Sequence, residues 1–128
     1  MAFYAGVGVS KQTQNSAAAG KEAAQLALKD AGIEAADVAI VISSAVFDQE
    51  AMLKGARDAL GSAPIVGCTS AGAITQSGVQ EQSVAVLALK SDEATFVPVK
   101  VNGIGADMRG AGKKFAEAVR AGGNGKPE

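Results

Sequence analysis

The chain has 128 residues, 48% of them hydrophobic and only 4% aromatic, which predicts one domain with a core of alanine and aliphatic side chains. Its net charge of -1 argues against a nucleic-acid-binding surface or a polybasic membrane anchor. One cysteine and no histidine exclude an internal disulfide, Ser-His-Asp triads, Cys-His dyads and most zinc sites. No run suits a membrane helix or a signal peptide, so we expect a cytoplasmic protein without a metal or cofactor.

The first segment, Phe3 to Ser10, alternates valine with small residues and predicts a strand. Its glycines, Gly6 and Gly8, begin no dinucleotide-binding fingerprint, and we interpret them as places where a neighbouring element packs closely. Ser16 is the predicted N-cap of a helix from Ala17 to Ala31, which shows apolar residues at helical spacing.

Two buried strands with a helix between them follow. Asp37 to Ser43 is a continuous apolar run, which is typical of a central strand covered on both faces. Asp48 is placed to cap a helix that continues to Leu60 and stops at Gly61. The short run from Pro64 to Gly67 then predicts a second buried strand.

Small polar residues follow both of these strands. If the strands are parallel neighbours, their exits lie side by side, and in open α/β sheets ligands bind beyond the carboxyl ends of strands. The predicted site therefore combines the strand exits with the residues just after them: Ser10, Ser43, Ser44, Phe47, Asp48, Cys68, Thr69, Ser70 and Gly72. Two plainer interpretations stay open: Asp48 only caps its helix, and Cys68 is a buried structural cysteine in a tight turn.

The remaining pattern completes an α/β fold. Ser83 to Leu89 and Ala94 to Val101 both read as strands, and the short link between them predicts an antiparallel hairpin. Lys113 to Ala121 predicts a final amphipathic helix. We therefore expect a mixed sheet with helical crossovers in the order β-α-β-α-β-β-β-α, forming a single domain over residues 1–128.

An internal repeat is visible at an offset of 92 residues. Ala19-Gly20-Lys21 aligns with Ala111-Gly112-Lys113, and Val7 and Val9 align with Val99 and Val101. Chance matches between alanines are the alternative in a chain so rich in alanine. The repeat predicts a tandem duplication whose second copy is incomplete, and thus part of a larger domain.

Several of these segments together resemble the N-terminal region of FIST domains. The matching segments are Ala5 to Ser10, the Ala-Gly-Lys-Glu-Ala-Ala opening of the first helix, Ser44 to Asp48 and Pro64 to Gly72, continued by the strand from Ser83 to Leu89. Gly67-Cys68-Thr69-Ser70-Ala71-Gly72 is the most specific of them. The resemblance implies an intracellular sensory module in signal transduction that binds a small ligand such as an amino acid. It also implies a longer N-terminal domain followed by a C-terminal one.

Three functional interpretations follow. The first is a non-catalytic sensor in which helix N-termini hold a ligand carboxylate and Asp48 holds an ammonium group. The second is an enzyme with Cys68 as nucleophile, which would need a helix N-terminus or a distant cation to activate the thiol. The third is an oligomerisation module that associates through an exposed sheet edge. We expect the sensor; the sequence names neither its signalling partner nor its ligand.

Overall fold

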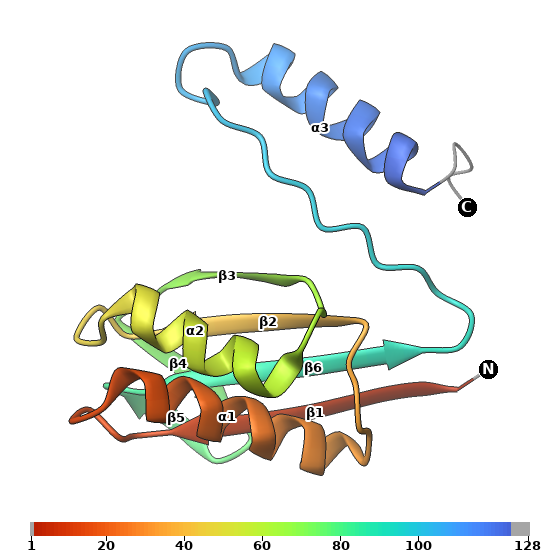
Figure 1. Cartoon of the computed structure of the whole chain (residues 1–128). Helices are drawn as coiled ribbons and strands as arrows, with labels where there is room; N and C mark the ends of the chain where they lie inside the picture. The colour runs from red at the N-terminus through yellow and green to blue at the C-terminus, as the bar shows by residue number, and fades with distance from the viewer. Residues whose placement is uncertain (1, 124–128) are drawn as a thin grey trace. The chain divides into compact units, whose positions relative to one another are not determined.

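A computed structural model describes residues 2–123, which form two compact units, residues 2–94 and residues 95–123 (Figure 1). The first unit holds most of the secondary structure, in the order β1 (Phe3–Ser10), α1 (Ser16–Ala31), β2 (Val38–Ser43), α2 (Gln49–Leu60), β3 (Ile65–Thr69), β4 (Gly72–Thr75), β5 (Gly78–Glu81) and β6 (Val84–Ser91). The second unit contains α3 (Met108–Gly122). The predicted α/β class with a mixed sheet is confirmed.

The first unit is built on a four-stranded sheet in the order β1-β6-β2-β3. Strands β2 and β3 are parallel neighbours, which is the condition on which the predicted site depended, whereas β6 runs antiparallel to both β1 and β2. Because β6 lies between β1 and β2, the first two strands of the chain are not neighbours.

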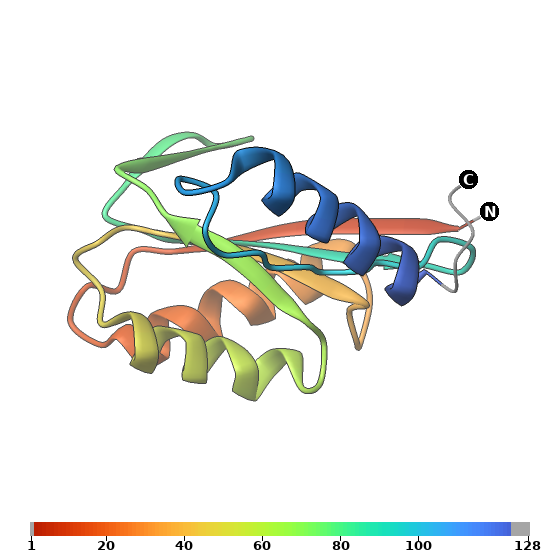
Figure 2. The same ribbon diagram turned by 90° about the horizontal axis from the view of Figure 1, so that it is seen from above.

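Helices α1 and α2 lie side by side on one face of this sheet (Figure 2). Their alanines, together with Met52, Val84 and Val86, form the core against the sheet. Gly6 and Gly8 allow α1 to lie directly on β1, because a Cβ atom at Gly8 would come within 2.0 Å of the carbonyl oxygen of Ala23. The predicted close packing at these glycines is confirmed.

The helix termini are fixed by side-chain caps. Asp48 caps α2, as predicted, and its carboxylate accepts a hydrogen bond of 2.9 Å from the amide of Ala51. The N-cap of α1 is Asn15 and not Ser16, so that prediction was wrong by one residue. Ser16 instead accepts a 3.0 Å hydrogen bond from the backbone N–H of Asp48, which ties the starts of the two helices together.

The predicted hairpin between residues 83–89 and 94–101 is wrong. Strand β6 pairs with β1 along one edge and with β2 along the other, so neither edge is left for a following strand. Residues 94–101 carry no strand assignment, and Pro98 has no N–H to donate to a ladder. The structure instead contains a hairpin that the sequence did not predict, in which β4 pairs antiparallel with β5.

In the second unit, α3 begins five residues earlier than predicted. Its first residue, Met108, lies 92 positions after Ser16, the first residue of α1. The caps repeat as well: Asp107 accepts from the amide of Gly110 at 2.9 Å, as Asn15 does from the amide of Ala18. The two helices therefore begin at the offset of the predicted repeat. No helix within residues 2–123 has the length and apolarity needed to cross a membrane.

Candidate functional site

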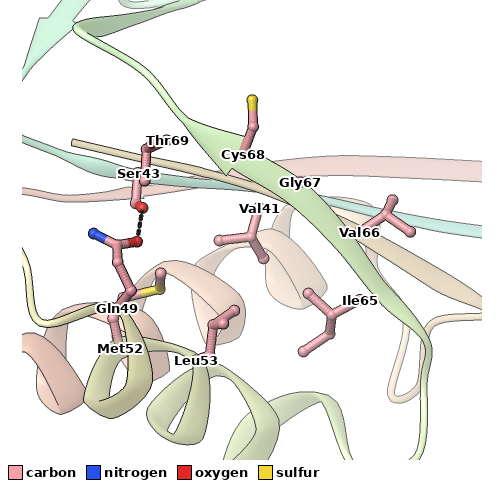
Figure 3. A pocket seen from close by; sticks show the side chains of 10 residues that line it. All are labelled: Val41, Ser43, Gln49, Met52, Leu53, Ile65, Val66, Gly67, Cys68 and Thr69. Carbon is pink, nitrogen blue, oxygen red and sulfur yellow. Dashed lines mark hydrogen bonds between the residues drawn. The ribbon is translucent and has the colours of Figure 1, made fainter. Parts of the chain in front are cut away.

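A groove of about 310 Å³ lies between β3, the end of β2 and the first turns of α2 (Figure 3). We call it the β3–α2 groove. Its lining residues come from these three elements and are all uncharged: Val41, Ser43, Gln49, Met52, Leu53, Ile65, Val66, Gly67, Cys68 and Thr69. The groove therefore offers a neutral, largely apolar surface.

The groove lies where β3 is only partly covered. Met52 is buried on the sheet side of α2, whereas Leu53 is 41% exposed and faces the groove together with Ile65 (Figure 3). Gly67 of β3 also lines the groove, and a Cβ atom at that position would come within 1.8 Å of the carbonyl oxygen of Val41. A side chain is thus excluded from the middle of β3.

One end of the groove is polar. The buried hydroxyl of Ser43 donates to Oε1 of Gln49 at 2.6 Å, as the dashed line in Figure 3 shows. The amide nitrogen of Gln49 donates to the carbonyl oxygens of Ser44 and Phe47, at 3.1 and 2.9 Å. Gln49 is therefore held on three sides and links the exit of β2 to the start of α2.

The predicted neighbouring strand exits are present in the structure. Ser43 and Thr69 lie opposite each other in the parallel register, and the amide of Ser70 donates to the carbonyl of Ser43 at 2.8 Å. Thr69 is exposed and lies beside Ser43, at the polar end of the groove (Figure 3). Ser43 and Thr69 thus approach each other as the sequence predicted.

Cys68 lies on the same strand but is directed differently. Its side chain is exposed, so the interpretation of Cys68 as a buried structural cysteine is wrong. The sulfur points away from α2, toward the opposite face of β3 (Figure 3). Cys68 therefore borders the groove without directing its thiol into it.

Two other predicted site residues lie elsewhere. Ser10 pairs with Val84 of β6, the strand that separates it from Ser43, and its buried hydroxyl donates to Glu22 at 2.5 Å. Phe47 is 4% exposed and belongs to the core. The structure therefore does not bring Ser10 or Phe47 into the groove.

The remaining predicted residues do not line the groove. The exposed carboxylate of Asp48 directly precedes Gln49 but does not line the groove. Ser44, Ser70 and Gly72 line a separate, filled crevice beside β4, in which the hydroxyl of Ser70 donates to the carbonyl of Gly72 at 2.7 Å. That crevice has no space for a ligand.

Sequence reasoning missed the helical and apolar walls of the groove, which are Val41, Gln49, Met52, Leu53, Ile65 and Val66. From sequence alone, an apolar residue beside a strand exit is predicted to lie in the core. Only the order of the strands in the sheet shows that α2 leaves β3 partly uncovered. Within residues 2–123, no three metal-ligating side chains lie close enough together to hold a metal ion.

The fold and the neutral groove define an α/β chain whose groove runs along β3 and reaches the carboxyl ends of two parallel strands. Residues 37–127 match the family model described as the FIST N domain. The chain therefore belongs to the FIST family of sensory and signalling domains. No curated protein matches its sequence.

Proposed function

We propose that this chain is a non-catalytic sensory domain that binds a small ligand, such as an amino acid, in the β3–α2 groove. The observation that carries the proposal is the composition of the groove, in which apolar walls lead to one polar end. Binding pockets commonly combine apolar surface with a few placed polar groups that orient the ligand. Met52, Leu53 and Ile65 supply the apolar surface, and Ser43, Gln49 and Thr69 supply the polar groups.

The lack of charged side chains in the groove limits the kind of ligand that can enter it. Because no charged side chain lines the groove, the ligand enters it with an apolar or neutral part. A zwitterionic ligand keeps its charged groups at the open end, where Thr69 is exposed and where Asp48 directly precedes Gln49. This arrangement suits an aliphatic amino acid, with the Asp48 carboxylate available to its ammonium group.

The same groove disfavours the enzyme interpretation. A cysteine nucleophile requires a cation, a general base or a helix N-terminus that favours its thiolate. The Cys68 sulfur points away from α2, and none of the groove residues carries a charge or is a histidine. These features support a binding role for the groove.

Thermal unfolding against a panel of free amino acids, small organic acids and nucleotides tests the proposal. A ligand that binds only the folded state stabilises it by RT ln(1 + [L]/Kd), about 2.7 kcal/mol at a hundredfold excess over Kd. We expect one amino acid to raise the unfolding temperature of the unaltered chain and to lose this effect in Thr69→Ala. A flat panel for both proteins would reject the small-ligand proposal.

Asp48→Asn provides the matched control for the charge. Asparagine keeps the cap of α2 because it is also a favoured N-cap residue, whereas the carboxylate charge is removed. A ligand whose ammonium group binds Asp48 therefore loses its stabilising effect in this variant, although the unliganded stability changes little. A retained effect would show that Asp48 acts only as a cap.

A further inference from the structure

The two edges of the four-stranded sheet differ in how they are protected. At β1, the outward N–H of Val7 donates to the carboxylate of Asp30 at 2.9 Å, so an acidic side chain occupies that edge. Charged groups on a sheet edge oppose pairing with another chain. At β3, the sequence from Ala59 to Gln80 contains no charged residue, and Gly67, Cys68 and Thr69 are all exposed.

The backbone groups that β3 directs outward follow from its hydrogen bonds. The carbonyl of Pro64 accepts from Ala39 of β2, and the amide of Ser70 donates to Ser43. In a parallel ladder the groups of alternate residues face the neighbour, so the even-numbered residues of β3 face β2. The N–H and C=O groups of Ile65, Gly67 and Thr69 therefore face away from the sheet.

From this asymmetry we propose that β3 pairs with β3 of a second copy of the chain, in antiparallel register centred on Gly67. In this register Gly67 lies opposite its own counterpart and Ile65 lies opposite the partner's Thr69. The outward N–H and C=O groups of Ile65, Gly67 and Thr69 in each copy then lie opposite outward groups of the other copy. A shift by two residues would leave one of them unpaired.

The pairing also completes the β3–α2 groove. Residues that lie opposite each other across an antiparallel pair direct their side chains to the same face of the sheet. Ile65 of the second copy therefore lies beside Thr69, at the open end of the groove. Only this consequence depends on the proposed ligand site, because the pairing itself requires no ligand.

The register predicts a specific cross-link on the opposite face. There, Val66 of one copy lies directly opposite Cys68 of the other. Because the backbone groups of both residues face β2, this is a non-hydrogen-bonded pair with Cα atoms about 4.5 Å apart, a distance that a disulfide spans. Two Cys68 residues are offset by two positions and lie roughly 8 Å apart, which is too far. We therefore mix the unaltered chain with Val66→Cys in a Cys68→Ser background, so that each partner contributes one thiol.

Under mild oxidation, the mixture is expected to give a disulfide-linked dimer of the two different chains, whereas each chain alone gives little. Equal cross-linking in all three samples would reveal random collisions and overturn the register. Sedimentation of the unaltered chain adds a test without substitutions: a dimer is expected, and a monomer at about 100 μM would overturn the proposal. Neither experiment contains a ligand, so failure here is distinct from a flat ligand panel.

Discussion

The Ser43 hydroxyl donates to the Gln49 side chain at 2.6 Å, and this contact joins the end of β2 to the first residue of α2. The same glutamine donates to the carbonyls of Ser44 and Phe47, so its side chain spans the whole connection between strand and helix. Gln49 therefore sets the shape of the polar end of the β3–α2 groove.

The replacement Gln49→Ala should loosen this connection. It leaves the buried hydroxyl of Ser43 without its present acceptor and releases two carbonyls, and an unsatisfied buried group costs about 1–3 kcal/mol. We expect a fall of this size in the free energy of unfolding, measured with urea. Glu50→Ala, at the next and exposed position, is the control and should change stability by less than about 0.5 kcal/mol.

The crossing of α1 and α2 should be intolerant of added volume. A Cβ atom at Gly55 would lie 1.9 Å from the carbonyl oxygen of Ala17, so Gly55→Ala forces the helices apart. We expect the free energy of unfolding to fall by about 1–3 kcal/mol, the usual cost of overpacking.

Gly112→Ala is the matched control for Gly55→Ala. A Cβ atom at Gly112 meets no atom within 4 Å, and alanine is favoured over glycine inside a helix by about 1 kcal/mol. Equal destabilisation by both substitutions in urea unfolding would contradict the packing described for Gly55.

Two methionines provide a further test of the core. Met52 is 2% exposed and packs in the centre of the first unit, whereas Met108 is 75% exposed. Truncation of a buried methionine to alanine costs about 2–5 kcal/mol, and surface substitutions usually change stability by less than about 0.5 kcal/mol. Met52→Ala should therefore lower the unfolding temperature strongly and Met108→Ala should leave it almost unchanged; similar shifts would place Met52 outside the core.

The N-cap of α1 is Asn15, one residue before the predicted Ser16. Asn15→Ala removes the acceptor of the Ala18 amide, and loss of an N-cap side chain costs about 0.5–2 kcal/mol. Asn15→Ser restores a capping oxygen and should recover most of this stability in thermal unfolding. If Asn15→Ser is as unstable as Asn15→Ala, the helix does not depend on the cap.

Local patterns predicted most of the elements in this fold. The apolar runs of β2 and β3 and the capping pattern at Asp48 are encoded within a few residues, so they were recognisable in the sequence. The insertion of β6 between β1 and β2 depends on contacts between distant residues, which no local pattern contains. The prediction of a hairpin after β6 failed for this reason.

The β4–β5 hairpin was missed because its large apolar residues, Ile74 and Val79, are not buried. Ile74 and Val79 lie opposite each other but are 87% and 68% exposed, so burial does not produce the alternation expected of a strand. The candidate site was predictable only in part. Ser43 and Thr69 follow from the parallel pairing of their strands, whereas Leu53 was not predicted because sequence periodicity cannot show where a helix layer ends.

Ligand binding in the groove is best tested by backbone amide chemical shifts of the full chain during titration with the amino-acid panel. We expect one ligand to shift the amides of Gln49, Leu53, Gly67 and Thr69 in a saturable manner. The amides of Thr75, Gln76 and Ser77, which line a different hollow, should remain unchanged. Saturable shifts confined to that second hollow, or no shifts with any ligand, would contradict the assignment of the groove as the sensory site.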